Sequence, residues 1–201
     1  MFPKIMLAIY LAVFTYFAFD PFEREVWFAE NLPVWIVVIS LILIYIYYHK
    51  FSNTAIALMS IFIIMHTIGG HYTFARVPFD WFTNFFGFER NHYDRIAHFS
   101  VGLYAFGLAE MFRAKRAVSN TFVLLSYPIF AILAIAALYE IFEWQFALLA
   151  DPNAGAEVLG SQGDVWDAQK DMLCDGLGAL FATGIFYLLH RGALLLSEDK
   201  R

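Results

Sequence analysis

The chain has 201 residues, of which 61% are hydrophobic and 15% are charged. A typical soluble domain is about 45–50% apolar and about 25% charged, so this composition indicates an integral membrane protein with the lipid bilayer as its partner. The net charge of −5 gives no indication of nucleic-acid binding. A single cysteine, Cys174, excludes an internal disulfide and a cysteine-based metal motif. The length suits one integral membrane domain, residues 1–201.

Six apolar segments follow one another along the chain, and a membrane-spanning helix needs roughly 17–25 residues. They are Ile5–Phe19, Leu32–Tyr48, Thr54–Gly70, Ile96–Phe112, Thr121–Leu149 and Met172–His190. The fifth segment is longer, so we expect it to tilt or to project beyond the lipid. The first segment lacks a small-residue cleavage site after it, so we interpret it as a retained helix and not as a signal peptide. The sequence therefore predicts an all-α, polytopic membrane helix bundle with six transmembrane helices.

The charges of the connecting segments predict how this bundle is oriented. Lysine and arginine are frequent in the short linkers at residues 49–53 and 113–120 and near both chain ends. Cytoplasmic loops carry such an excess of positive charge. We therefore expect both termini to be cytoplasmic and three loops to be outside, at residues 20–31, 71–95 and 150–171.

The middle outer loop is dense in Phe, Tyr and Trp, with Pro78 and Gly87 as helix breakers. Aromatic side chains favour the interface between membrane and water. We expect this loop to lie flat at the outer surface or to fold back over the bundle. An aromatic belt is the simpler interpretation, and a substrate-binding lid is the alternative.

Four aspartates lead into the last apolar segment: Asp164, Asp167, Asp171 and Asp175. Their steps of three, four and four residues return to one face of a helix, so the carboxylates would form one stripe. Like charges repel, and carboxylates near hydrocarbon are costly. The stripe therefore predicts cations that meet it, and the candidates are a metal ion, an arginine or shared protons.

Further acidic and imidazole side chains fall on the same predicted side of the membrane. Asp94 and His98 are four residues apart at the start of the fourth segment. Glu140 and Glu143 are three apart near the outer end of the fifth, and His71 follows the third. Such side chains can converge in a bundle as ligands of divalent metals. The metal-ligand candidates are His71, His98, Glu140, Glu143, Asp164, Asp167, Asp171 and Asp175, and the catalytic candidates are Asp94, His98, Glu140 and Asp171.

The excess of carboxylates over histidines favours Mg²⁺, Mn²⁺ or Ca²⁺, with Zn²⁺ as a further candidate. A bound metal would acidify a water molecule and stabilise a phosphoryl or carbonyl oxygen, while one free carboxylate acts as general base. The alternative is a structural role. Arg76, Arg90 and Arg95 lie on the same predicted side and are candidate partners of the acids, and Asp164 and Asp167 are candidate caps of the last helix.

Four stretches of sequence carry a family resemblance: GGHYTFARVPF, NHYDRIAHFSVG, LYEIFEWQF and LGSQGDVWDAQKDMLCDGLGA. Together they resemble the YjdF-type bacterial inner-membrane family, and the resemblance covers nearly the whole chain. It implies a multi-pass protein of the bacterial inner (cytoplasmic) membrane and no defined activity.

A weaker similarity reaches the VanZ-like membrane proteins, which imply cell-envelope biology. These proteins carry an acid followed by histidine at the start of a span, a later glutamate, and a D-x-x-x-[DN]-x-x-G run. The matching positions are Asp94, His98, Glu140, Asp171, Asp175 and Gly178. Asp175 stands where that family usually has asparagine, and no clear arginine precedes the run.

Three functions fit these residues. The first is a metal-dependent membrane hydrolase acting from the outer leaflet on a lipid or a lipid-linked, phosphate-containing substrate. The second is an ion- or proton-coupled carrier, which needs polar residues through the inner half of the spans, where the sequence offers mainly Glu110 and His66. The third is a non-catalytic membrane scaffold whose polar cluster locks helices together.

Overall fold

The computed structural model describes the backbone of residues 1–198 and the side chains of residues 1–192. Every regular element in that part of the chain is a helix. In chain order the helices are α1 (Phe2–Phe17), α2 (Arg24–Tyr47), α3 (Asn53–Tyr72), α4 (Asp80–Phe86), α5 (Tyr93–Gly102), α6 (Tyr104–Ala114), α7 (Thr121–Leu149), α8 (Pro152–Leu159) and α9 (Asp167–Glu198). The predicted all-α class is confirmed.

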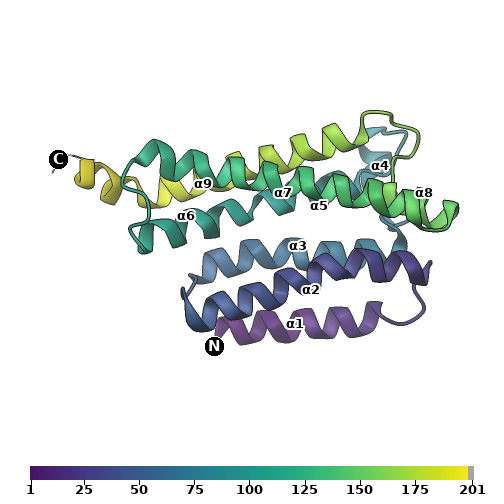
Figure 1. Ribbon diagram of the computed structural model, residues 1–201, viewed down its shortest axis with the longest axis horizontal. Coiled ribbons are helices and arrows are strands. Elements are labelled where there is room, and N and C mark those ends of the chain that lie inside the picture. The colour runs from purple at the N-terminus through teal and green to yellow at the C-terminus, as the bar shows by residue number, and fades with distance from the viewer. Residues whose placement is uncertain (199–201) are drawn as a thin grey trace.

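The long helices run back and forth along one axis (Figure 1). Helices α1, α2 and α3 form one layer, and α5, α6, α7 and α9 form the other. The layers meet where α3 packs against α5 and α6. Both chain ends lie at one end of the bundle, called the terminal end below, and α4 and α8 lie at the opposite end, called the loop end (Figure 1).

Four helices are long and apolar enough to cross a membrane: α2, α3, α7 and the part of α9 from Asp167 to Gly192. Helix α1 is apolar but has 16 residues, fewer than the other four. The fourth predicted span occurs as two shorter helices, α5 and α6, which are separated at Leu103. Large apolar side chains cover the outside of the long helices, as lipid contact requires; examples are Ile36, Leu138 and Leu188.

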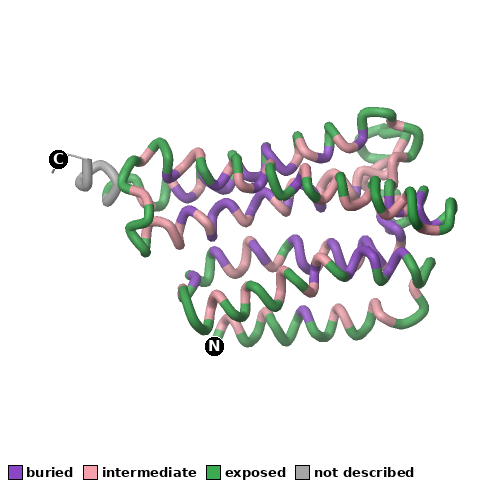
Figure 2. The backbone as a smooth tube through the Cα atoms, in the orientation of Figure 1, coloured by how far each residue is buried: buried purple, intermediate pink, exposed green. Residues whose placement is uncertain are grey.

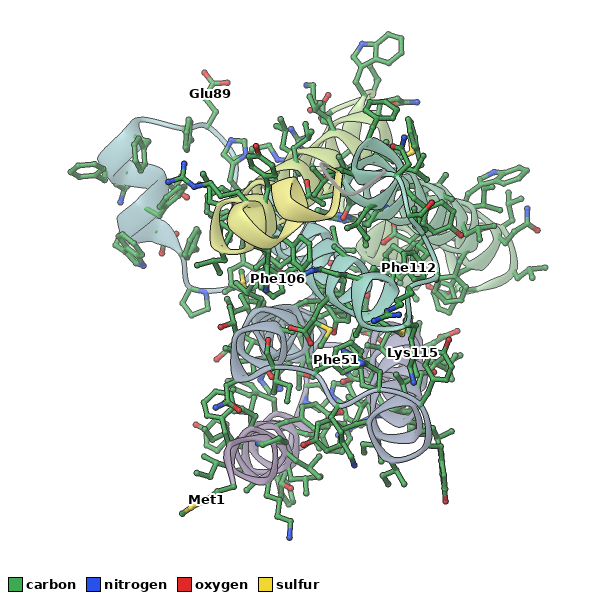
Figure 3. The ribbon with its side chains drawn as sticks, turned by 90° about the vertical axis from the view of Figure 1, so that its left-hand side faces the viewer. Met1, Phe51, Glu89, Phe106, Phe112 and Lys115 are labelled. Atoms are coloured by element: carbon green, nitrogen blue, oxygen red, sulfur yellow. The ribbon has the colours of Figure 1, made fainter. Side chains whose placement is uncertain are left out.

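Buried residues concentrate where the helices face one another (Figure 2). Phe106 of α6 lies at the centre of the bundle when it is viewed from the terminal end (Figure 3). Its ring packs edge-on against Phe186 of α9, with the ring centroids 5.5 Å apart. Ile132 of α7 joins the same apolar core, which fills the bundle towards the terminal end.

Helices α5 and α9 approach each other at glycines. A Cβ atom on Gly178 would overlap the backbone carbonyl of Phe99, and one on Gly102 would overlap the backbone of Gly178. Small residues allow membrane helices to pack backbone against backbone. This close approach brings the face of α9 that carries Asp175 next to the face of α5 that carries His98.

Helix α8 divides the third outer loop, where no helix separate from the last one was predicted. The Asp151 side chain accepts a hydrogen bond from the Asn153 backbone N–H at its start, and Gly160 ends it with a φ of +55°. Its apolar side packs Val158 near Val26 of α2, and its backbone also packs against α7. Helix α8 therefore links the end of α7 to the beginning of α2.

Helix α4 stands off the side of the bundle (Figure 3). It has no buried residue, and Trp81 and Phe85 are 68% and 79% exposed. Helix α4 therefore lies beside the bundle, whereas the two ends of the same loop pack into it, with Phe74, Val77 and Tyr93 buried. Exposed rings of this kind suit a membrane–water interface.

Candidate functional site

Acidic and imidazole side chains gather inside the bundle near the loop end. Helix α5 presents Asp94 and His98 four residues apart on one face, and α9 presents Asp171. One ligand atom from each of these three residues lies within 4.8 Å of the other two. Ligands bound at about 2.0–2.6 Å from a cation are separated by up to about 5 Å, so this group, called the Asp–His–Asp cluster below, has the spacing and the ligand types of a divalent metal site.

Asp175 orients the histidine of this cluster. Its Oδ2 atom lies 3.1 Å from His98 Nδ1, and the Asp175 side chain is fully buried. When Nδ1 carries the proton, the Nδ1–H group donates a hydrogen bond to this carboxylate. The lone pair on Nε2 is then free on the side of Asp94, whose Oδ1 lies 3.6 Å from Nε2. Metal-binding histidines are held by a carboxylate partner in this way.

Several carboxylate oxygens at the site are buried without a hydrogen-bond partner among the described residues. They are Oε1 of Glu140, Oδ1 of Asp171 and Oδ1 of Asp175. Glu140 of α7 also lies close enough to His98 and Asp171 for their charges to interact. Buried polar atoms are nearly always paired, so these oxygens favour a cation or a shared proton at this place.

The first two aspartates of the stripe are held by cations of the chain itself. Arg95 Nη2 donates to Asp164 Oδ2 at 3.0 Å and to Asp167 Oδ1 at 2.6 Å. Arg90 Nη1 donates to Asp167 Oδ1 at 2.5 Å, and Lys170 Nζ donates to Asp164 Oδ2 at 2.6 Å. The hydrogen bonds from Lys170 and Arg95 hold the pKa of Asp164 well below its ordinary value. We call this group the rim network.

Arg95 also extends from the rim network towards the cluster. Its Nε atom lies 3.1 Å from Asp171 Oδ1, which is ion-pair distance, but the two atoms are not aligned for a hydrogen bond. The guanidinium therefore offsets part of the negative charge of Asp171 and leaves this oxygen without a donor. Asp171 is the point at which the rim network and the Asp–His–Asp cluster meet.

The structure separates the eight predicted metal ligands into groups. His98 and Asp171 lie in the cluster, and Asp175, Glu140 and Glu143 lie around it. Asp164 and Asp167 lie in the rim network. There they pair with Arg90 and Arg95, which the structural alternative had named as their candidate partners. His71 lies elsewhere: its Nδ1 is 3.0 Å from the Phe17 carbonyl oxygen, at the contact of α3 with α1.

A second buried polar group lies nearby and was not predicted as part of the site. His66 Nε2 is 3.1 Å from Glu30 Oε2, and the Tyr139 hydroxyl donates to the same oxygen at 2.7 Å. Glu30 was assigned to an outer loop, but α2 begins at Arg24 and carries it into the bundle. The sequence does carry a signal for this longer helix: Val26 and Ala29 are apolar and continue the helical pattern of the following segment towards the N-terminus.

One cavity of about 200 Å³ connects the two polar groups. His66, Asp94, His98, Tyr139, Glu143 and Asp175 line it towards the loop end. Towards the middle of the bundle its walls are apolar, and include Val37, Phe62, Val101, Leu108, Ile132 and Ala136. Binding sites often have this form, an apolar cavity with a few converging polar groups.

Comparison with known proteins places the chain in a family. Residues 2–192 match the family described as "Predicted membrane protein (DUF2238)". The chain is 32% identical over 170 residues to the inner membrane protein YjdF of Escherichia coli (strain K12), covering 84% of this chain and 80% of that protein. No solved structure matches the chain. Similarity to the VanZ-like proteins stays a prediction.

These matches agree with the four long apolar helices and confirm a multi-pass location in the inner membrane. They also confirm the resemblance that the four sequence stretches carry. The chain belongs to the DUF2238 family of membrane proteins and is a relative of the inner membrane protein YjdF.

Proposed function

We propose that this protein is a metal-dependent membrane hydrolase whose divalent cation is bound by Asp94, His98 and Asp171. The observation that carries the proposal is the convergence of these three side chains from two helices, with ligand atoms within 4.8 Å of one another. The buried, unpartnered oxygens of Glu140 and Asp175 support it, because a cation would offset their charge.

We also propose that six segments cross the membrane, with both termini in the cytoplasm. Besides the four long helices, the crossing segments are α1 and the consecutive pair α5 and α6. The alternating course of the helices supports this topology, since both chain ends share the terminal end (Figure 1). The linkers at that end carry Lys50, Arg113, Lys115 and Arg116, as cytoplasmic loops do. The Asp–His–Asp cluster then lies in the extracytoplasmic half of the membrane.

The proposed substrate is a lipid or lipid-linked molecule with a phosphate ester near its polar head. The metal would lower the pKa of a bound water molecule and stabilise charge on a phosphoryl oxygen. Glu140, next to the cluster, is the proposed general base that takes a proton from this water. Water adds across the ester bond, and the products are an alcohol and a phosphate.

The carrier hypothesis is less well supported by the structure. Leu103, Phe106 and Ile132 fill the bundle between the cluster and the terminal end. In the inner half, Glu110 accepts a hydrogen bond from the Ser52 backbone N–H at 2.8 Å and lies 3.1 Å from His49 Nε2. Glu110 therefore has local partners at the terminal end, and an apolar core separates it from the polar groups around the cavity.

Metal content tests the proposal directly. The purified protein is dialysed against Mg²⁺, Mn²⁺, Ca²⁺ or Zn²⁺, and the bound metal is counted by mass spectrometry while thermal unfolding is followed. We expect one cation to bind near stoichiometry and to raise the melting temperature, and Asp171→Asn and His98→Gln to abolish both effects. Asp164→Asn is the matched control, because Asp164 lies in the rim network and should leave metal content unchanged.

The same experiment separates the three functions. A wild-type protein that binds none of the four metals and shows no metal-dependent stabilisation contradicts the hydrolase. If His98→Gln then only lowers stability, the cluster serves as a scaffold. Cation flux in proteoliposomes that Asp175→Asn abolishes would support the carrier instead.

A further inference from the structure

The cavity reaches the side of the bundle between α2 and α7. Pro33 and Val37 of α2 and Ile135 and Ala136 of α7 line it. Ile135 is also 55% exposed, so the cavity meets the outer surface at this residue. Over the described length of both helices, no Cα atom of α2 lies within 8 Å of one of α7. We call this opening the side window.

The surface around the side window is apolar. Ile36 and Ile39 of α2 are 59% and 57% exposed, and Leu138 of α7 is 66% exposed. Both helices are long and apolar enough to cross a membrane. Exposed aliphatic side chains at this depth face hydrocarbon, because a membrane helix meets lipid wherever it meets no protein. The side window therefore opens into the bilayer and not into water.

The loop end of the cavity is covered. Helix α8 packs across from α7 to α2 at that end. Glu157 of α8 accepts a hydrogen bond from the Thr73 hydroxyl at 2.9 Å and pairs with Arg76. These contacts join α8 to the segment that follows α3. The polar groups underneath are buried, and Glu30, His66 and His98 are at most 8% exposed.

From these observations we infer that the cavity binds the hydrocarbon chain of an amphiphile that enters from the outer leaflet through the side window. An amphiphile in that leaflet has its head near the loop end and its chain towards the middle of the membrane. The cavity has the same polarity, with its polar groups towards the loop end and Val37, Leu108 and Ile132 deeper. The chain-binding site stands on the cavity alone. The assignment to the outer leaflet rests on the proposed topology, and the reaction of the head group rests on the proposed function.

The hydrogen bond from Tyr139 to Glu30 crosses the side window at its polar edge. It joins α7 to α2 where their backbones are apart. The head group of the amphiphile passes this bond before it meets the Asp–His–Asp cluster. Tyr139 also lines the cavity, so this bond lies beside the path of the entering molecule.

Photolabelling tests the inference. The protein is reconstituted in vesicles of phosphatidylethanolamine and phosphatidylglycerol with a phosphatidic acid that carries a diazirine midway along one acyl chain. After irradiation, labelled residues are mapped by mass spectrometry. We expect label on the residues that line the cavity, Pro33, Val37, Ile132 and Ala136. Label confined to outward-facing residues such as Leu138 overturns the inference.

Two pairs of variants give matched controls. Ala136→Phe fills the cavity from α7, whereas Ala134→Phe adds the same ring to an exposed position on the same helix. Val37→Phe and Ile36→Phe form the corresponding pair on α2. The two cavity-filling variants should lose most of the window label and the two controls should keep it. Equal labelling of a folded Ala136→Phe or Val37→Phe variant and its control overturns the inference. Should both cavity-filling variants unfold, the wild-type map alone decides.

Metal content is measured on the same samples, so that failure of the chain-binding site can be distinguished from failure of the hydrolase proposal. Window label without bound metal supports the chain-binding site and contradicts the hydrolase. Bound metal with no window label contradicts the chain-binding site and leaves the Asp–His–Asp cluster as proposed.

Discussion

Asp175 and His98 face each other across the contact between α5 and α9, with Asp175 Oδ2 3.1 Å from His98 Nδ1. Gly102 and Gly178 permit this short distance, because without a Cβ atom the two helix backbones can pack in direct contact. The packing of small residues therefore sets the orientation of the imidazole, and through it the geometry of the Asp–His–Asp cluster.

The first prediction concerns this pair. Asp175→Asn keeps the shape of the side chain and removes the charge that favours a proton on Nδ1. Loss of such a carboxylate partner typically weakens metal binding by about 10–100-fold. We expect that loss in a metal titration followed by calorimetry, with Asp94, His98 and Asp171 intact. Cys174→Ser, one residue earlier on α9 and outside the cluster, is the control, and equal affinities for the two variants would contradict the proposed role of Asp175.

The second prediction compares two cations of the rim network. Arg95 pairs with buried Asp167 and Asp171, whereas Lys170 is 46% exposed in its pair with Asp164. Removing one partner of a buried ion pair costs about 3–5 kcal/mol, and an exposed pair contributes about 0–1 kcal/mol. Denaturant unfolding in micelles should show a large loss of stability for Arg95→Ala and a small one for Lys170→Ala. A reversed order would show that Arg95 does not stabilise the fold through these acids.

A third prediction uses two glycines of α9. A methyl group at Gly178 would overlap the Phe99 carbonyl, whereas Gly184 has open space. Overpacking costs typically about 1–3 kcal/mol, and alanine favours a helix by up to about 1 kcal/mol over glycine. Gly178→Ala should therefore lower the melting temperature, while Gly184→Ala leaves it unchanged or raises it. A Gly178→Ala protein as stable as the wild type would contradict the close packing of α5 and α9.

The fourth prediction concerns pH and the contact that fastens α8. The hydrogen bonds and charge of Arg76 lower the pKa of Glu157 below its ordinary value of 4.5. The ionised carboxylate therefore stabilises the fold fully above pH 4.5, and this contribution is lost as the pH falls through the lower pKa of the folded protein. Both side chains are partly exposed, so the contribution is at most about 1 kcal/mol.

The measurement is the melting temperature of Glu157→Gln and of the wild type between pH 3 and pH 8. The variant should melt lower at neutral pH, and the difference should shrink at the acid end. Glu25→Gln, at an exposed position in the first turn of α2, is the control. A difference that is constant across the range would show that the charge of Glu157 does not hold α8.

Hydropathy was sufficient to find the segments of the bundle but not all of their ends. The fifth segment was predicted with the bounds of α7, because it is apolar along its whole length. The second was predicted from Leu32, but α2 begins at Arg24. Glu25, Glu30 and Asn31 lowered the local hydropathy, and burial of Glu30 against His66 allows the helix to continue through them.

The candidate site was predictable where the spacing was helical. Asp94 with His98, and Asp171 with Asp175, are i and i+4 pairs on α5 and α9. His66 and Tyr139 were missed, because a single histidine or tyrosine in an apolar segment is usually a packing residue. Their part in the cavity depends on how α2, α3 and α7 bring Glu30, His66 and Tyr139 together, which is a tertiary property that a periodic pattern does not contain.

The arrangement of the two layers has a mechanical consequence. They share a seam where α3 packs against α5 and α6, and on the side of α2 and α7 they are joined at the loop end by α8. On that side the two layers are held by α8 and by the hydrogen bond from Tyr139 to Glu30, and no direct packing of α2 on α7 supports it. Lipid that fills the space beside these two helices therefore takes the place of a helix–helix contact, so the bilayer completes the packing of this protein.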